Sequence, residues 1–219
     1  RMRHFTRTIG LTVVVLAALA GNVFAGEQEP FVLASGGRAH AVVVPYNGDT
    51  NGVGYAANEL ARYLGKISGA SFMVADKPVK GYKTLLVGAP YKPSKTEELC
   101  IRVKDRNTLE FTGDGARGTL YAVYDFLETL GVVFSMNDYE YIPSIRDLSI
   151  AGDYTKTDAP CMIWRDGWGV ITSTDTPYAM KLRLAANPSH PLWKDFGGIQ
   201  ADIGQTLTGR WMAPRKYFK

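Results

Sequence analysis

The glycine-rich stretch at residues 113–118 is the part of this sequence whose spacing most directly suggests chemistry. Gly113, Gly115 and Gly118 follow an apolar run and precede a helical pattern, which is the G-x-G-x-x-G spacing of dinucleotide-binding loops. In such loops a pyrophosphate approaches the backbone at the N-terminus of a helix. Asp138 follows roughly where an acid would bind the ribose. A lone glycine fingerprint is a weak signal, and a dinucleotide-binding domain is therefore one alternative for this chain.

The same stretch also has a purely structural interpretation. Gly113 and Gly115 would allow positive φ in a tight turn from a strand into a helix. Thr112 or Asp114 would cap the N–H groups of the first helical turn. Arg117 would then point outward, as a surface residue or as a contact with a neighbouring domain. This interpretation needs no cofactor.

The acidic residues do not form a recognisable catalytic pair. Glycoside hydrolysis uses two carboxylates held about 5–10 Å apart on either side of a sugar. Glu59, Glu110 and Glu128 lie on predicted helices or on a strand, where we expect a solvated face. Glu140 and Asp166 are harder to assign to such a face, but neither has an identifiable partner. We therefore predict no catalytic residue in this chain.

Metal, nucleophile and nucleic-acid sites are not predicted either. The sequence has no HExxH motif, no clustered Cys/His spacing and no G-x-S-x-G motif. It also lacks a Lys/Arg cluster with interleaved aromatic residues, so nothing indicates nucleic-acid binding. Cys100 and Cys161 are the only cysteines. They would either pair in an exported protein or remain two buried free thiols.

Residues 1–25 have the pattern of a signal peptide. Arg1, Arg3 and Arg7 precede an apolar run at residues 9–20, and residues 23–25 form a small-x-small cleavage site. The apolar run is shorter than the roughly 20 residues that a membrane-spanning helix needs. We therefore expect export to the periplasm, cell surface or medium, with no membrane span after cleavage. Cleavage leaves 22 basic and 21 acidic residues, or a net charge of +1.

Residues 26–152 predict a mixed α/β domain. Apolar residues recur at spacings of three and four over residues 53–67 and 115–130, which predicts two helices. Strands are predicted at residues 31–33, 41–44, 71–74, 84–87, 99–103, 108–112, 132–134 and 148–150. The pair at 99–103 and 108–112 flanks an Asp/Asn-bearing turn, which indicates a β-hairpin. This order favours a mixed sheet with both helices on one face over a doubly wound fold.

The composition of the sequence changes after this domain. Residues 153–160 are a linker by composition, and residues 161–219 are predicted to begin a second domain. Cys161–Trp164 is a candidate for a buried strand. Only 59 residues follow Pro160, far fewer than the roughly 200 or more that a barrel needs. We therefore expect the chain to be part of a longer protein.

Five stretches resemble known carbohydrate-active proteins when they are taken in order. They are Glu59–Ala70, Leu85–Gly88, Gly115–Gly131, Glu140–Pro143 and Pro160–Arg165. Together they resemble the N-terminal domain of α-glucuronidases. They are also similar to the second domain of β-N-acetylhexosaminidases and of related secreted proteins with a hexosaminidase-like barrel. The resemblance extends over more than half of the chain, and the stretch at the second helix is its most specific part.

The resemblance implies an α/β domain without catalytic residues and without a cofactor. Such a domain packs on a following (β/α)₈ barrel, which binds the carbohydrate and holds the acid pair. Residues 161–219 would then be the truncated start of that barrel, with the acid pair beyond Lys219. Arg165 and Trp168 match positions near the rim of a sugar site and are the candidate substrate-binding residues. Without neighbouring strands, residues from 161 onward are expected to pack poorly.

Three hypotheses for function remain. The first is an accessory domain of an exported glycoside hydrolase-like protein that acts in glycan breakdown. The second is a stand-alone carbohydrate-binding or cell-surface module. A platform of exposed aromatic residues would favour it, but all four tryptophans lie after the α/β domain. The third is a dinucleotide-dependent enzyme.

The signal peptide gives the first testable prediction. Exported protein should begin at Gly26 or within a few residues of it, because the basic region, apolar run and cleavage site occur in the required order. N-terminal sequencing of secreted material checks this. Recovery of residues 5–19 still attached to protein in a membrane fraction would contradict it.

Overall fold

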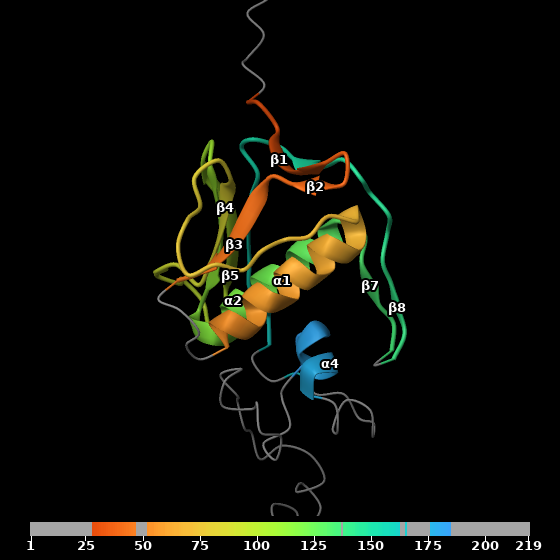
Figure 1. The fold of residues 1–219 in the computed structure, drawn as a ribbon. Helices are drawn as coiled ribbons and strands as arrows, with labels where there is room; N and C mark the ends of the chain where they lie inside the picture. Colours follow the sequence, from red (N-terminus) through yellow and green to blue (C-terminus); the bar gives the residue numbers. More distant parts are fainter. Residues whose placement is uncertain (1–27, 47–51, 137, 163–164, 166–175, 185–219) are drawn as a thin grey trace, which may run out of the picture.

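A five-stranded mixed sheet forms the centre of the fold (Figure 1). The computed structural model describes residues 28–46, 52–136, 138–162, 165 and 176–184. In chain order the elements are β1 (Phe31–Ser35), β2 (Arg38–Ala39), β3 (Ala41–Pro45), α1 (Val53–Ser68), β4 (Lys83–Val87), β5 (Leu99–Asp105), β6 (Thr108–Gly113), α2 (Gly115–Thr129), β7 (Val133–Phe134), β8 (Glu140–Tyr141), β9 (Leu148–Ile150), β10 (Thr155–Asp158) and α4 (Thr176–Lys181). The fold is mixed α+β, as predicted.

The central sheet has the strand order β10-β5-β6-β4-β3. Strands β3, β4 and β6 run parallel, whereas β5 is antiparallel to both β6 and β10. The predicted hairpin is confirmed, because β5 and β6 follow each other directly and Ile101 lies opposite Phe111. Two smaller sheets, β2-β1-β9 and β7-β8, flank the central one. This antiparallel content distinguishes the fold from a doubly wound parallel sheet.

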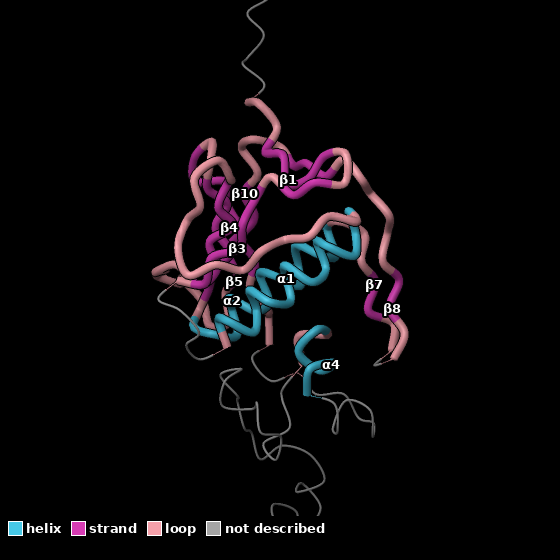
Figure 2. Tube along the Cα trace, viewed as in Figure 1, coloured by secondary structure: helices cyan, strands magenta, loops and turns pink. Residues whose placement is uncertain are grey.

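Helices α1 and α2 lie side by side against the sheet (Figure 2). Leu60 and Leu64 of α1 and Leu120, Val123 and Leu127 of α2 are all fully buried, as their helical spacing predicted. Alternate strand residues supply the other half of this core: Val43, Leu85, Val87, Ile101, Leu109 and Phe111. The two predicted helices therefore share one hydrophobic core with the sheet.

Two predicted segments differ in the structure. Residues 71–74 form only an isolated bridge, in which Val74 pairs with Val43, because the segment passes β3 on its way to β4. Residues 155–158, inside the predicted linker, form β10 and extend the central sheet at β5. Their side chains are polar and mostly exposed, as an edge strand allows, so the apolar pattern gave no signal for this strand.

The segment after β10 packs more closely than the sequence predicted. Cys161 and Met162, proposed as the start of a buried strand, are exposed and lie in no strand. In contrast, Tyr178, Ala179 and Met180 of α4 are buried, and Met180 belongs to the main core. The expectation of poor packing beyond residue 161 is therefore wrong for these three residues. In the described ranges no helix is long and apolar enough to cross a membrane.

Truncation of Leu120 tests the packing of α2. The side chain is 1% exposed, so Leu120→Ala should lower the free energy of unfolding by about 2–5 kcal/mol. Val133→Ala is the matched control, because Val133 is 51% exposed and should change stability by less than about 1 kcal/mol. Urea denaturation measures both. Equal losses of unfolding free energy in the two variants would show that the apolar face of α2 does not pack in the core.

Candidate functional site at the junction of α2 and α4

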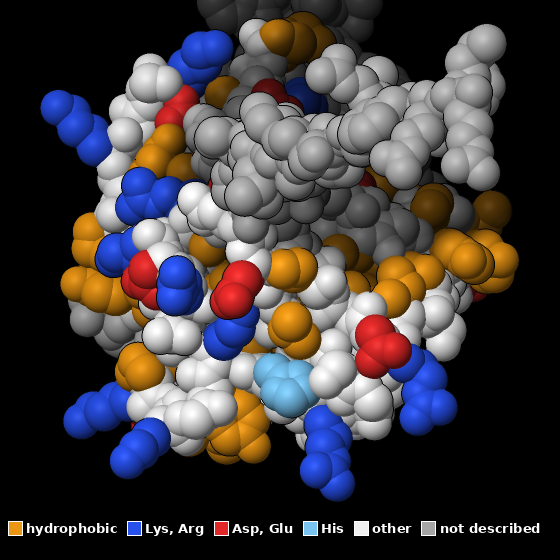
Figure 3. Space-filling model, turned by 90° about the horizontal axis from the view of Figure 1, so that it is seen from above, with side chains coloured by type: hydrophobic (Ala, Val, Ile, Leu, Met, Phe, Trp, Pro, Cys, Tyr) orange, Lys and Arg blue, Asp and Glu red, His pale blue; other side chains and the backbone are white. Residues whose placement is uncertain are grey.

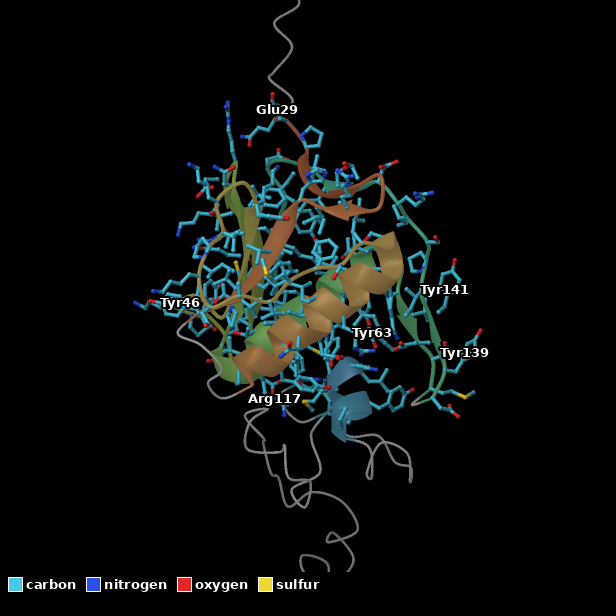
Figure 4. The ribbon with its side chains drawn as sticks, in the orientation of Figure 1. Glu29, Tyr46, Tyr63, Arg117, Tyr139 and Tyr141 are labelled. Atoms are coloured by element: carbon cyan, nitrogen blue, oxygen red, sulfur yellow. The ribbon has the colours of Figure 1, made fainter. Side chains whose placement is uncertain are left out.

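A buried carboxylate, that of Glu97, lies at the end of the α/β domain nearest α4. Glu97 is 2% exposed. Its Oε1 lies 2.7 Å from Nε of Arg117, on the first turn of α2. Its Oε2 lies 2.5 Å from Nη2 of Arg165, which follows β10. One carboxylate is thus shared by two arginines from opposite sides of the predicted domain boundary. Figure 4 shows Arg117 at this end of the helices.

The glycine pattern explains how Glu97 reaches this position. A β-carbon at either Gly113 or Gly118 would overlap the carbonyl oxygen of Glu98, so only glycine allows this close approach. The N–H of Asp114 donates to that carbonyl at 2.7 Å, and Oδ2 of Asp114 accepts from the N–H of Glu97 at 2.8 Å. The G-x-G-x-x-G spacing therefore serves as a packing motif that holds residues 97–98 against the start of α2.

Two expectations about this turn are wrong. Asp114 occupies the N-cap position but makes no side-chain bond to its own helix, because its carboxylate binds Glu97. Arg117 does not point outward as a surface residue. It is buried, donates to the hydroxyl of Tyr121 at 2.5 Å and reaches the carbonyl of Leu184 at 3.4 Å. This last contact reaches the chain after α4, and a role of Arg117 between two domains stays a prediction.

A second ionic network lies next to the first. Asp125 of α2 binds Nζ of Lys156 at 2.6 Å and Nη2 of Arg183 at 3.1 Å. The same guanidinium binds Glu128 at 2.6 Å. The hydrogen bond to Asp125 raises the pKa of Lys156. β10 and the residues after α4 are thus both tied to α2 by charge.

A pocket of about 320 Å³ lies between these two networks. Its lining residues are Glu97, Leu99, Tyr121, Asp125, Glu128, Asp158, Ala159, Pro160, Arg165, Leu182 and Arg183. Glu97, Asp125 and Glu128 in this lining pair with Arg165 or Arg183, whereas Asp158 accepts the backbone N–H of Ala159. Burial raises the pKa of the Tyr121 phenol, so this hydroxyl remains protonated in the pocket.

The structure places one of the two predicted sugar-site residues in this pocket. Arg165 is mostly buried, and its Nε donates to the carbonyl of Arg183 at 2.8 Å. Another of its nitrogens donates to the carbonyl of Met162. The Arg165 guanidinium therefore connects the chain after β10 to Glu97 and to the residues that follow α4. Trp168 lies outside the described residues. The role of both residues in binding sugar remains a prediction.

A third charged cluster surrounds Glu140 on β8. Its carboxylate accepts from Tyr63 and Lys66 of α1, the latter at 2.8 Å, and lies 3.4 Å from Nζ of Lys181 in α4. Burial opposes ionisation of Glu140. The hydrogen bonds from Lys66 and Tyr63 and the charge of Lys181 outweigh it and lower the pKa to about 2. Phe134 supports this cluster with its ring edge-on to that of Tyr63.

Two carboxylates expected on solvated faces are buried instead. Glu59 accepts from the Tyr124 hydroxyl at 3.0 Å and from Arg62 at 2.8 Å. Glu110 lies between Arg102 and Lys104, at 2.7 and 2.9 Å. Both expectations failed because an alternating or helical pattern does not show which polar residues have partners. Glu128, as expected, remains partly exposed.

These carboxylates form ion pairs and hydrogen bonds within the fold. A glycosidase acid needs a raised pKa, whereas Glu110 and Glu140 both have lowered ones. No group of three metal-ligating side chains occurs among the residues that the structure covers. Cys100 is buried and Cys161 is exposed, and both are free thiols. Their disulfide is therefore not formed in this structure.

No protein-family model matches the chain, and no curated protein matches it. Among solved structures, a family GH115 4-O-methyl-alpha-glucuronidase with specificity for decorated arabinogalactans aligns with a TM-score of 0.56 and 16% identity. The alignment covers 78% of this chain and 29% of that protein. The likeness shows a glycoside-hydrolase-like fold, and this chain spans less than a third of that neighbour.

Two other solved structures align less well. A GH138 enzyme targeting pectin rhamnogalacturonan II gives a TM-score of 0.41 and 18% identity, over 57% of this chain and 16% of that one. CpGH84D, a glycoside hydrolase of family GH84, gives a TM-score of 0.35 and 14% identity, over 60% of this chain and 23% of that one.

The lowered pKa of Glu140 predicts a specific pH dependence of stability. Its ionised form is favoured by folding, so its contribution is fully present above its usual pKa of 4.5 and is lost as the pH falls towards 2. The stability difference between wild type and Glu140→Gln should therefore shrink between about pH 5 and pH 2. Asp138→Asn, on the same hairpin, is the control. Urea titrations showing a pH-independent difference for Glu140→Gln would contradict this.

Proposed function

We propose that this chain is the accessory, non-catalytic α/β domain of an exported glycoside hydrolase-like protein that acts on glycans, together with the start of its barrel. The observation that carries the proposal is the fold likeness to the α-glucuronidase, which extends over 78% of this chain. The lowered pKa values of Glu110 and Glu140 agree with a domain that lacks a glycosidase acid.

In this proposal the domain acts as a support for the unit that comes after it. Three cations beyond residue 160 bind carboxylates of the α/β domain. Arg165 binds Glu97, Lys181 approaches Glu140, and Arg183 binds Asp125 and Glu128. The Arg165–Glu97 pair is largely buried, so displacing Arg165 would remove compensation from a buried charge, whereas the pairs of Lys181 and Arg183 are more exposed. The α/β domain would thereby set the position of the barrel's first segments.

Carbohydrate would bind in the barrel that this chain begins, with Arg165 and Trp168 near its rim. We propose a glycan as the class of substrate. Removal of the signal peptide at Ala25 would place the protein outside the cytoplasm. The Gly113–Gly118 stretch has no part in binding a ligand in this proposal, because it packs against Glu98.

A stand-alone carbohydrate-binding module is a second candidate function. Tyr139 and Tyr141 of the β7–β8 hairpin are 61% and 57% exposed and point away from the body of the molecule (Figure 4). Val133 lies opposite Tyr141 and is also exposed. Exposed aromatic rings offer apolar faces with a polar edge, which suits the C–H face of a sugar.

An activity assay separates these functions. The 219-residue chain should not hydrolyse aryl glycosides or aryl glucuronides, whereas a protein in which it continues into a complete barrel of about 200 or more residues should. Turnover by the chain alone, lost in Glu140→Gln or Asp166→Asn, would contradict the accessory role. Retention of the chain on insoluble polysaccharide, lost in a Tyr139→Ala/Tyr141→Ala variant, would support the second candidate instead.

A further inference from the structure

A larger cavity lies at the opposite end of the α/β domain. It has a volume of about 600 Å³ and is formed by the β2–β3 corner and the segment between α1 and β4. Its lining residues are Gly37, Arg38, Ala39, His40, Ala41, Val42, Ser71, Met73, Gly81 and Tyr82. β1 and β2 lie at one end of the molecule and α4 at the other, so this cavity is remote from the junction (Figure 1).

The walls of the cavity are mainly apolar. Met73 and Tyr82 are half exposed, although large apolar side chains are normally buried when a neighbour is available. Ala39 also lines the cavity and is partly exposed, and the buried Ala41 and Val42 lie behind it. A concave apolar surface of this size with a few polar groups is typical of sites for small organic molecules.

Arg38 brings a positive charge to the cavity. Arg38 and His40 line it, and none of its lining residues is acidic. Oγ of Ser35 lies 2.6 Å from Nε2 of His40 and orients the ring. No carboxylate in the described part of the chain pairs with Arg38. Its guanidinium is therefore available to a ligand.

One basic and one acidic residue lie beside the turn between β1 and β2. Nη2 of Arg146 would lie 3.7 Å from a β-carbon at Gly37. The neighbouring acid, Asp147, accepts the N–H of Gly36 at 2.8 Å. Basic side chains project around the rim of this face of the molecule (Figure 3). Because the lining holds Arg38 and no acidic residue, charge complementarity inside the cavity favours an anion.

We propose that this cavity is a binding site for a small carboxylate with a flat apolar body. Arg38 would bind the carboxylate through its planar fork of N–H donors. The body of the ligand would lie against Tyr82 and Met73. This site is separate from the junction and does not depend on the accessory role proposed above.

Titration of the chain with three probes tests the site. Benzoate supplies a carboxylate on a flat ring, cyclohexanecarboxylate supplies it on a puckered ring, and benzyl alcohol supplies the ring alone. Benzoate at millimolar concentrations should move the backbone amide NMR signals of residues 37–42 and 71–82. Cyclohexanecarboxylate should bind more weakly, and benzyl alcohol should produce no saturable shift.

Two variants assign the interactions. Arg38→Gln should weaken benzoate binding about fivefold or more, because the charged hydrogen bonds are lost. Tyr82→Leu keeps an apolar side chain but removes the ring, and should reduce the preference for benzoate over cyclohexanecarboxylate. Arg106→Gln, on the turn between β5 and β6, is the control and should leave binding unchanged. Absence of saturable shifts, shifts confined to other residues, or an equal loss in Arg106→Gln would overturn the proposal.

Discussion

The junction depends on the requirement that the buried charge of Glu97 be balanced. A carboxylate that is 2% exposed loses its hydration, and this cost is offset only when cations lie within hydrogen-bonding distance. Arg117 and Arg165 meet this requirement at 2.7 and 2.5 Å. Arg117 pairs with Glu97 from α2, and Arg165 adds a second charged contact from the chain after β10, so docking of that segment strengthens the compensation of the buried charge. Electrostatics therefore links the α/β domain to the segment that begins after β10.

The glycine spacing and the lack of a side-chain cap at the start of α2 both follow from this constraint. Glu97 enters the junction only because Gly113 and Gly118 leave room for the backbone of Glu98. Asp114 then binds the Glu97 N–H rather than capping its own helix. A stretch that has the spacing of a nucleotide-binding loop is here used to place an acid beside an arginine.

Periodicity predicted most of the fold because it reports burial of apolar residues. The helices at 53–67 and 115–130 and the hairpin at 99–112 were found in this way. It could not predict the ionic networks, since a buried acid such as Glu97 shows no pattern without its partners. It also placed Glu110 on a solvated face. One signal in the sequence could have indicated the contact of Arg117 with Tyr121. The two residues are four positions apart, and residues at that spacing lie on the same face of a helix.

A double-mutant cycle on Glu97 and Arg165 measures the central interaction most directly. Unfolding free energies of Glu97→Gln, Arg165→Gln and the double variant give the coupling between the two side chains. The account predicts a coupling above about 1.5 kcal/mol, since the pair is largely desolvated. The more exposed Glu128–Arg183 pair should couple by less than about 1 kcal/mol. Additivity of the Glu97 and Arg165 substitutions to within about 0.5 kcal/mol would contradict the account.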